Sequence, residues 1–172
     1  MKIIQGKDGK AYCLFFRQYE TNGFCSNWYL SDFEEDGITY SCVEQYMMYK
    51  KAKLFKDEAV ASQILNTTSQ RDIKALGRKV RNFNEEVWDK HKQDIVNQGV
   101  YLKFKQNSKL QTEILSAKVD TFVECSPYDS VWGIKTDISD RVACTTPSMW
   151  RGENRLGMAL KNAIEKILEE RE

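Results

Sequence analysis

The sequence predicts an α+β fold that is predominantly helical, with a small β-sheet, organised as a single domain over residues 1–172. The length of 172 residues lies within the usual size range of one domain. From about Cys42 onward the apolar residues recur mostly with a helical period, which predicts a series of helices. Short aromatic and β-branched runs near residues 11, 38 and 121 predict strands.

Two strands are expected before the first helix. Residues 11–16 form a short aromatic and apolar run that is typical of a buried strand. An Asp-Gly turn leads into a second run at residues 38–40, and the two strands would form the small sheet. The helical period that follows breaks near residues 56–57, where the first long helix is expected to end.

Side chains that suit helix N-caps mark the later helices. The expected helices run from Asp57 to about Leu65, from Ser69 to near Val80, from Asn84 to about Leu102, and from Ser108 to about Leu115. Gly99 weakens the middle of the third of these helices and predicts a kink there. Residues 121–124 predict a strand, and a last helix is expected from about Asn154.

The composition restricts the class of protein. Lys plus Arg (26) nearly equals Asp plus Glu (25), so no global field favours nucleic acid or an anionic membrane. The chain shows no signal peptide and no long apolar run, so a cytoplasmic location is expected. Five cysteines without a C-x-x-C spacing and a single His91 predict neither a metal site nor a cofactor, and a Cys-His nucleophilic pair is a minor alternative.

One face of the first helix carries the most informative pattern. Glu44, Met48, Lys51 and Phe55 follow each other at i, i+4, i+7 and i+11 and therefore share this face. With a rise of about 1.5 Å per residue, Glu44 and Lys51 lie on the order of 10 Å apart, so both side chains would reach one small ligand. The alternative is a half-exposed face whose two charges simply reach water.

The segment from residue 124 to residue 150 is the second candidate. Glu124 ends a predicted strand and Asp129 follows in a loop, where a fixed carboxylate suits acid and base chemistry. An Asx-turn or a helix cap is the alternative for Asp129. Trp132 and Trp150 would stack on a base if they are exposed to a ligand, or else cover the core.

Two basic features complete the candidates. The start of the last helix, with Arg151 and Arg155 beside it, is a possible anion site, although an ordinary cap would have the same sequence. The basic residues at positions 71, 74, 78, 79 and 81 alternate with apolar ones, which indicates a solvated amphipathic helix. Nucleic-acid binding through that helix is the alternative.

Taken together, these segments resemble the YbiA-like, or NADAR, family over most of the chain. The stretches that carry the resemblance are residues 24–27, 36–46, 51–52, 76–78, 103–104, 123–124 with 126–134, and 150–157. Seven stretches in the same order are more specific than any single motif. Gln45 stands where the family usually has His. Glutamine forms hydrogen bonds but does not titrate, so no proton-transfer role is expected at this position.

The resemblance implies an N-glycosidase without a cofactor. Its substrates would be riboflavin-pathway ribosylaminopyrimidine phosphates or ADP-ribosylated guanine, including guanine in nucleic acid. The implied catalytic residues are Glu44, Lys51 and Asp129, and the implied substrate-binding residues are Phe24, Ser26, Asn27, Glu124, Trp132, Gly133, Trp150, Asn154 and Gly157.

The expected chemistry assigns acid and base work to Glu44, with a pKa raised by burial beside Met48. Lys51 has two open roles, as a nucleophile that forms a Schiff base or as a cation that holds a phosphate. A module that binds ADP-ribose or NAD without catalysis is the alternative function.

Overall fold

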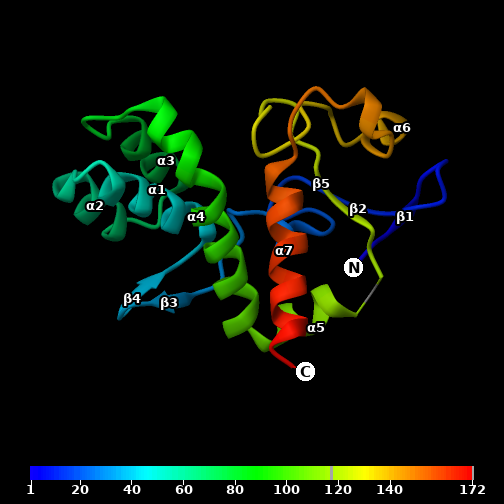
Figure 1. The fold of residues 1–172 in the computed structure, drawn as a ribbon, viewed down its shortest axis with the longest axis horizontal. Helices are drawn as coiled ribbons and strands as arrows, with labels where there is room; N and C mark the ends of the chain where they lie inside the picture. Colours follow the sequence, from blue (N-terminus) through cyan, green and yellow to red (C-terminus); the bar gives the residue numbers. More distant parts are fainter. Residues whose placement is uncertain (117, 172) are drawn as a thin grey trace.

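The computed structural model describes residues 1–116 and 118–171, and within them the predicted class, a predominantly helical α+β fold, is confirmed (Figure 1). Helix α4 packs against both α1 and α7, and α1 also packs against α2 and α3. In Figure 1, α1, α2 and α3 lie on the opposite side of α4 and α7 from β1 and α6. None of the helices in the described residues is long and apolar enough to cross a membrane.

Apart from the short α6, where the sequence predicts irregular structure, the helices begin close to where the sequence predicts. They are α1 (Val43–Leu54), α2 (Glu58–Leu65), α3 (Gln70–Arg78), α4 (Glu85–Gln106), α5 (Ser108–Leu115), α6 (Arg141–Cys144) and α7 (Arg155–Glu169). The side chains of Asp57, Ser69 and Asn84 accept backbone N–H groups at the starts of α2, α3 and α4, as expected for N-caps. The predicted cap at Ser108 is wrong, because Ser108 is the first helical residue and Asn107 precedes it.

Helix α4 runs without interruption through Gly99, so the predicted kink does not divide it. A Cβ atom at Gly99 would lie 2.7 Å from a ring carbon of Tyr46 on α1. The missing side chain therefore allows α1 and α4 to approach closely, which explains a glycine in the middle of a long helix.

The strands form two sheets within the described residues. One sheet holds β1 (Ile4–Gln5), β2 (Ala11–Phe15) and β5 (Thr121–Glu124) in the order β1-β2-β5, and the other pairs β3 (Phe33–Glu35) with β4 (Ile38–Tyr40). The expectation that residues 11–16 and 38–40 share a sheet is wrong, because β2 pairs in parallel with the distant β5. This register places Phe15 opposite Glu124 and so fixes the end of β5.

The two faces of the three-stranded sheet pack against different parts of the molecule. Cys13, Phe15 and Phe122 belong to the main core under the helices. Leu14 and Val123 point to the opposite face, where a smaller core also contains Tyr12, Cys125, Ile134 and Cys144. Successive residues of a strand point to opposite faces, so the sheet separates the two cores.

Candidate active site

A cavity of about 260 Å³ lies between α1, α3, the end of β5 and two loops. Its walls are formed by Asn27, Trp28, Glu44, Met47, Met48, Lys51, Lys74, Gly77, Arg78, Glu124, Asp129 and Trp132. A second hollow of about 410 Å³ adjoins it and shares Trp28, Lys74, Glu124 and Asp129. The structure thus brings together six of the residues that the sequence singled out, namely Asn27, Glu44, Lys51, Glu124, Asp129 and Trp132.

Glu44 lies in the first turn of α1, and its backbone N–H donates to the Asn27 carbonyl at 3.0 Å. Burial raises the pKa of its carboxyl to about 7, and the neighbouring charge of Asp129 acts in the same direction. The positive charges of Lys74 and Lys51 oppose this rise in pKa. Glu44 therefore exchanges its proton near neutral pH.

Glu124 ends β5, where its backbone N–H donates to the Asn154 side chain at 3.1 Å. Its Oε2 atom is buried and has no hydrogen-bond partner among the described residues. Burial raises the pKa of Glu124 to about 8, and the charges of Asp129 and Glu44 add to the rise. Two carboxyls that hold protons near neutrality therefore face one cavity.

Asp129 has a structural contact as well as a place on the cavity wall. Its Oδ1 atom accepts the backbone N–H groups of Val131 and Trp132, each at 2.8 Å. The Asx-turn considered for this residue therefore exists, and it shapes the loop that carries Trp132 to the cavity. The same carboxylate supplies the negative charge that acts on Glu44 and Glu124.

Lys51 is half-buried between α1 and α3. Its Nζ atom donates to the Gly77 carbonyl at 2.9 Å and lies 4.5 Å from the ring centre of Phe83. Burial lowers the pKa of Lys51, whereas the charge of Glu44 opposes that change. Lys51 therefore has a larger neutral fraction than an exposed lysine.

Asn27 contributes an unusual group to the cavity. Its side chain is only 5% exposed, and its Oδ1 atom is buried without a partner among the described residues. An unpaired buried acceptor costs about 1–3 kcal/mol, so such atoms are typically completed by a ligand or water. Together with Glu124 Oε2, it gives the cavity two buried oxygen atoms that have no hydrogen-bond partner among the described residues.

Phe24 and Ser26 do not line this cavity, although they hold the loop that does. Their carbonyl oxygens accept hydrogen bonds from Lys103 Nζ at 2.6 and 2.9 Å. Lys103 is 1% exposed, and burial lowers its pKa to about 8. The pattern of basic residues alone gave no reason to expect this buried contact, which fixes the loop next to Asn27.

Asn154, Gly133 and Gly157 also lie outside the cavity, where they contact the backbone of β5 next to Glu124. The Asn154 side chain donates to the Phe122 carbonyl at 2.8 Å and accepts from the Glu124 backbone. A Cβ atom at Gly133 would lie 2.8 Å from the Glu124 carbonyl, and one at Gly157 would overlap the Phe122 carbonyl. These residues let α7 and the loop approach β5 closely.

At the start of α7, the hydrogen bonds favour an ordinary helix start over the anion site that was the other interpretation. The backbone N–H groups of Arg155 and Leu156 donate to the carbonyls of Val131 and Trp132, each at 3.1 Å. The Arg155 side chain pairs with Glu153. The donors that an anion would need are therefore taken by the loop after Asp129.

Trp150 does not lie on the cavity either. Its indole N–H donates to the Cys144 carbonyl at 3.1 Å, and its ring packs against the smaller core. The alternative of a tryptophan that covers the core therefore holds for this residue. Trp28, which the sequence did not single out, lies on the cavity wall instead.

Lys74 and Arg78 are two further cavity residues that the sequence did not assign to the site. They lie four residues apart on α3, on the side that faces the cavity, and both side chains are otherwise exposed. Their i, i+4 spacing was visible, but a cavity rim and a solvated helix face have the same pattern. Arg81, from the same basic run, pairs instead with the buried Asp57.

Within the described residues, no group of three His, Cys, Asp or Glu side chains is arranged to hold a metal ion. The side chains that line the cavity provide two proton-holding carboxyls, one carboxylate, a half-buried amine and two exposed cations.

Comparison with known proteins places this cavity in a family. The model of the NADAR domain matches residues 14–168. The chain is 42% identical to N-glycosidase R617 of Acanthamoeba polyphaga mimivirus over 147 residues, 82% of this chain and 85% of the relative. It is 33% identical to protein irg-1 of Caenorhabditis elegans over 174 residues, 92% of this chain and 80% of the relative.

A solved structure agrees with the fold. The NMR structure of the Escherichia coli protein YbiA matches with a TM-score of 0.76 and 24% identity, and covers 98% of this chain and 91% of that one. N-glycosidase YbiA of Escherichia coli strain K12 is 24% identical over 153 residues, 89% of this chain and 86% of the relative. The family that the sequence resembled is confirmed, and the chain belongs to the NADAR domain family.

Proposed function

We propose that this cavity hydrolyses the N-glycosidic bond between a phosphorylated ribose and an amino-substituted base. The protein is a hydrolase of N-glycosyl compounds, the class named for its viral relative and for YbiA. The observation that carries the proposal is that Glu44, Glu124 and Lys51 meet in one cavity with Lys74 and Arg78 at its rim.

The two glutamates supply the acid. Breaking a glycosylamine bond requires a proton on the departing amine, since an amide-like anion is a poor leaving group. With pKa values of about 7 and about 8, Glu44 and Glu124 still hold protons at neutral pH. The Asp129 carboxylate stabilises the positive charge that develops at the anomeric carbon.

Lys51 serves as the nucleophile. Its half-buried position lowers its pKa, which a nucleophilic amine requires, whereas the exposed Lys74 and Arg78 suit the phosphate better. The neutral amine bonds to the anomeric carbon as the bond to the base breaks and a glutamate protonates the leaving amine. Opening of the sugar ring gives a Schiff base, and water then releases the sugar and regenerates Lys51.

The remaining walls suit the two ends of such a substrate. Trp28 and Trp132 offer flat aromatic surfaces for a base. The unpaired Asn27 Oδ1 accepts a hydrogen bond from a ribose hydroxyl or an amino group. The adjoining hollow leaves room for more than a ribose 5-phosphate, so an ADP-ribosyl group is included in the proposed substrates.

One assay tests the class and the substrate together. The protein and its Glu44→Gln variant are incubated with a ribosylaminopyrimidine phosphate and, separately, with ADP-ribosylated guanosine, and the released sugar is measured. We expect release from at least one substrate and a loss of about 100-fold or more in the variant. Tight binding by calorimetry with no release from either substrate would indicate a binding module instead.

Trapping tests the role of Lys51. Borohydride added during turnover reduces a Schiff base to a stable adduct, which peptide mass spectrometry is expected to locate at Lys51. The Lys50→Arg variant is the control, because Lys50 pairs with Glu35 away from the cavity. If turnover proceeds and no lysine adduct forms, water attacks directly and Lys51 acts only as a charge.

A further inference from the structure

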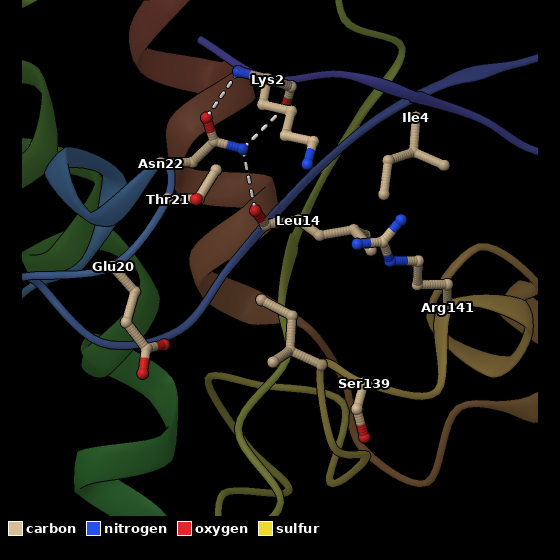
Figure 2. A pocket seen from close by; sticks show the side chains of 9 residues that line it. Lys2, Ile4, Leu14, Glu20, Thr21, Asn22, Ser139 and Arg141 are labelled. Atoms are coloured by element: carbon tan, nitrogen blue, oxygen red, sulfur yellow. Dashed lines mark hydrogen bonds between the residues drawn. The ribbon is translucent and has the colours of Figure 1, made fainter.

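A separate hollow of about 370 Å³ lies on the opposite face of the three-stranded sheet (Figure 2). Its walls come from the chain start with β1, from β2 and the loop after it, and from the loop before α6 with the first residue of α6. They comprise Lys2, Ile4, Leu14, Glu20, Thr21, Asn22, Ile138, Ser139 and Arg141. None of these residues lines the catalytic cavity or the hollow next to it.

The alternation of β2 and β5 explains why the two sites are separate. Leu14 lies in this hollow and in the smaller core, whereas its neighbour Phe15 lies in the main core. Glu124, which pairs with Phe15, lines the catalytic cavity. The sheet therefore stands between the two spaces, and a ligand in one does not touch a ligand in the other.

The wall of this hollow is held in place before any ligand arrives. The buried Asn22 side chain accepts the Lys2 backbone N–H at 2.8 Å, and its Nδ2 atom donates to the carbonyls of Lys2 and Leu14 at 2.7 and 2.9 Å. These three bonds, drawn in Figure 2, join the chain start to β2. The backbone of Lys2 is fixed, while its side chain extends over the hollow.

The hollow carries an excess of positive charge. Figure 2 shows the ends of the Lys2 and Arg141 side chains directed into the space beside Leu14, and neither forms an ion pair among the described residues. The nearby carboxylates are engaged elsewhere: Asp137 accepts from Ser139, and Asp140 accepts from the Ala143 backbone. Glu20 is the one carboxylate on the wall, and it points away from both cations in this view.

Apolar side chains form the rest of the surface, from Ile4, Leu14 and Ile138. We propose that this hollow binds a small organic anion, with its anionic group between Lys2 and Arg141 and its apolar part against these three side chains. Such a ligand would gain both charge-assisted hydrogen bonds and apolar burial, which inorganic phosphate alone would not. This site is independent of the proposed catalytic reaction.

The test uses the ¹⁵N-labelled full chain and three probes that share a phenyl ring and differ in the polar group attached to it. Phenyl phosphate, benzoate and neutral benzyl alcohol are titrated separately, and amide NMR shifts at Lys2, Thr21 and Arg141 are followed. We expect saturable shifts with at least one of the two anions and none with the alcohol. The anion that binds tighter identifies the preferred anionic group.

Variants distinguish anion binding in this hollow from anion binding in the catalytic cavity, whose cations also attract anions. The Lys2→Gln, Arg141→Gln double variant is expected to raise the Kd at these amides about tenfold, and Glu20→Gln to lower it about twofold. Lys74→Gln, which alters the catalytic rim, should leave this Kd unchanged. The proposal is overturned if the anions cause no shifts here, if the double variant binds as well, or if benzyl alcohol binds equally.

Discussion

Glu44 and Glu124 come from distant parts of the sequence and meet at one cavity, where both are kept from water and both lie near the Asp129 charge. Burial and like charge disfavour ionisation, so each carboxyl keeps its proton at a pH where an ordinary glutamate has lost it. The burial of two acids therefore has a measurable consequence both for catalysis and for stability.

The pH dependence of the rate follows from these two carboxyls. The acid form is present below their pKa values of about 7 and about 8 and is lost as the pH rises through them. Because the proposed nucleophile Lys51 must also be neutral, we expect a bell-shaped profile of kcat/KM. The rate rises with pH as Lys51 loses its proton, and it falls by up to about tenfold per pH unit once the glutamates have ionised and Lys51 has no further proton to lose; steady-state rates from pH 5 to 10 measure both limbs. Glu34→Gln, at an exposed glutamate, should keep the same profile, and a rate that stays flat from pH 6 to 10 would contradict the acid role.

The same proton affinity affects the stability of the fold. In the unfolded chain Glu124 ionises near its ordinary pKa of 4.5, whereas the folded protein holds the proton until about pH 8. A raised pKa stabilises the folded state below pH 4.5, and this contribution is lost as the pH rises to about 8.

Glu124→Gln carries no such charge and should therefore gain stability relative to the parent as the pH rises. We expect a gain on the order of 1–3 kcal/mol at pH 9 and little at pH 4.5, with about 2–4 °C in Tm for each kcal/mol. Thermal unfolding at both pH values measures it. Equal gains at the two pH values would mean that packing, not ionisation, is the cause.

At the scale of elements, α3 supplies the cations at the cavity rim. Lys74 and Arg78 face the cavity, whereas Lys79, the C-cap residue of the same helix, does not. We expect Lys74→Gln to raise KM for a phosphorylated substrate about tenfold with a small change in kcat, because it removes a phosphate contact made equally before and during the reaction. Lys79→Gln is the matched control, and equal effects of both variants on KM would indicate a general charge effect.

The elements also show which features could be predicted from the sequence. The caps at Asp57, Ser69 and Asn84 are local interactions, so the starts of α2, α3 and α4 could be predicted from neighbouring residues. The spacing of Glu44 and Lys51 placed both on one helix face for the same reason.

Long-range pairing could not be predicted in this way. The pairing of β2 with β5 depends on packing across the chain, and neither strand specifies its partner by composition. Trp28 reaches the cavity through a loop that Lys103 holds, and nothing near Trp28 in the sequence indicates that contact. Lys74 and Arg78 were missed because an amphipathic helix has the same pattern beside a cavity as beside water.

At the scale of the whole molecule, the five thiols report on the integrity of both cores. All five cysteines are free, and each is at most 1% exposed. We expect the native protein to react with fewer than about one equivalent of Ellman's reagent over several minutes, because a buried thiol is inaccessible to the reagent. In denaturant all five should react.

A parallel sample unfolded with guanidinium gives the total thiol count for comparison. Fast reaction of two or more thiols in the native protein would show that one of the two cores opens readily, because four of the five cysteines are divided between the two cores. Cys13 and Cys25 belong to the main core, and Cys125 and Cys144 belong to the smaller one.

The parallel pairing of β2 with β5 also bears on how the protein is made. Just before these strands meet, the Ala11 N–H bonds to Asp120, a residue 109 positions later. Closing a loop of this size costs about 4 kcal/mol of chain entropy, which the early helices do not repay by themselves. On the proposed mechanism, a nascent chain that still lacks β5 also lacks the acid Glu124, so the catalytic cavity is expected to be completed only after most of the polypeptide has left the ribosome.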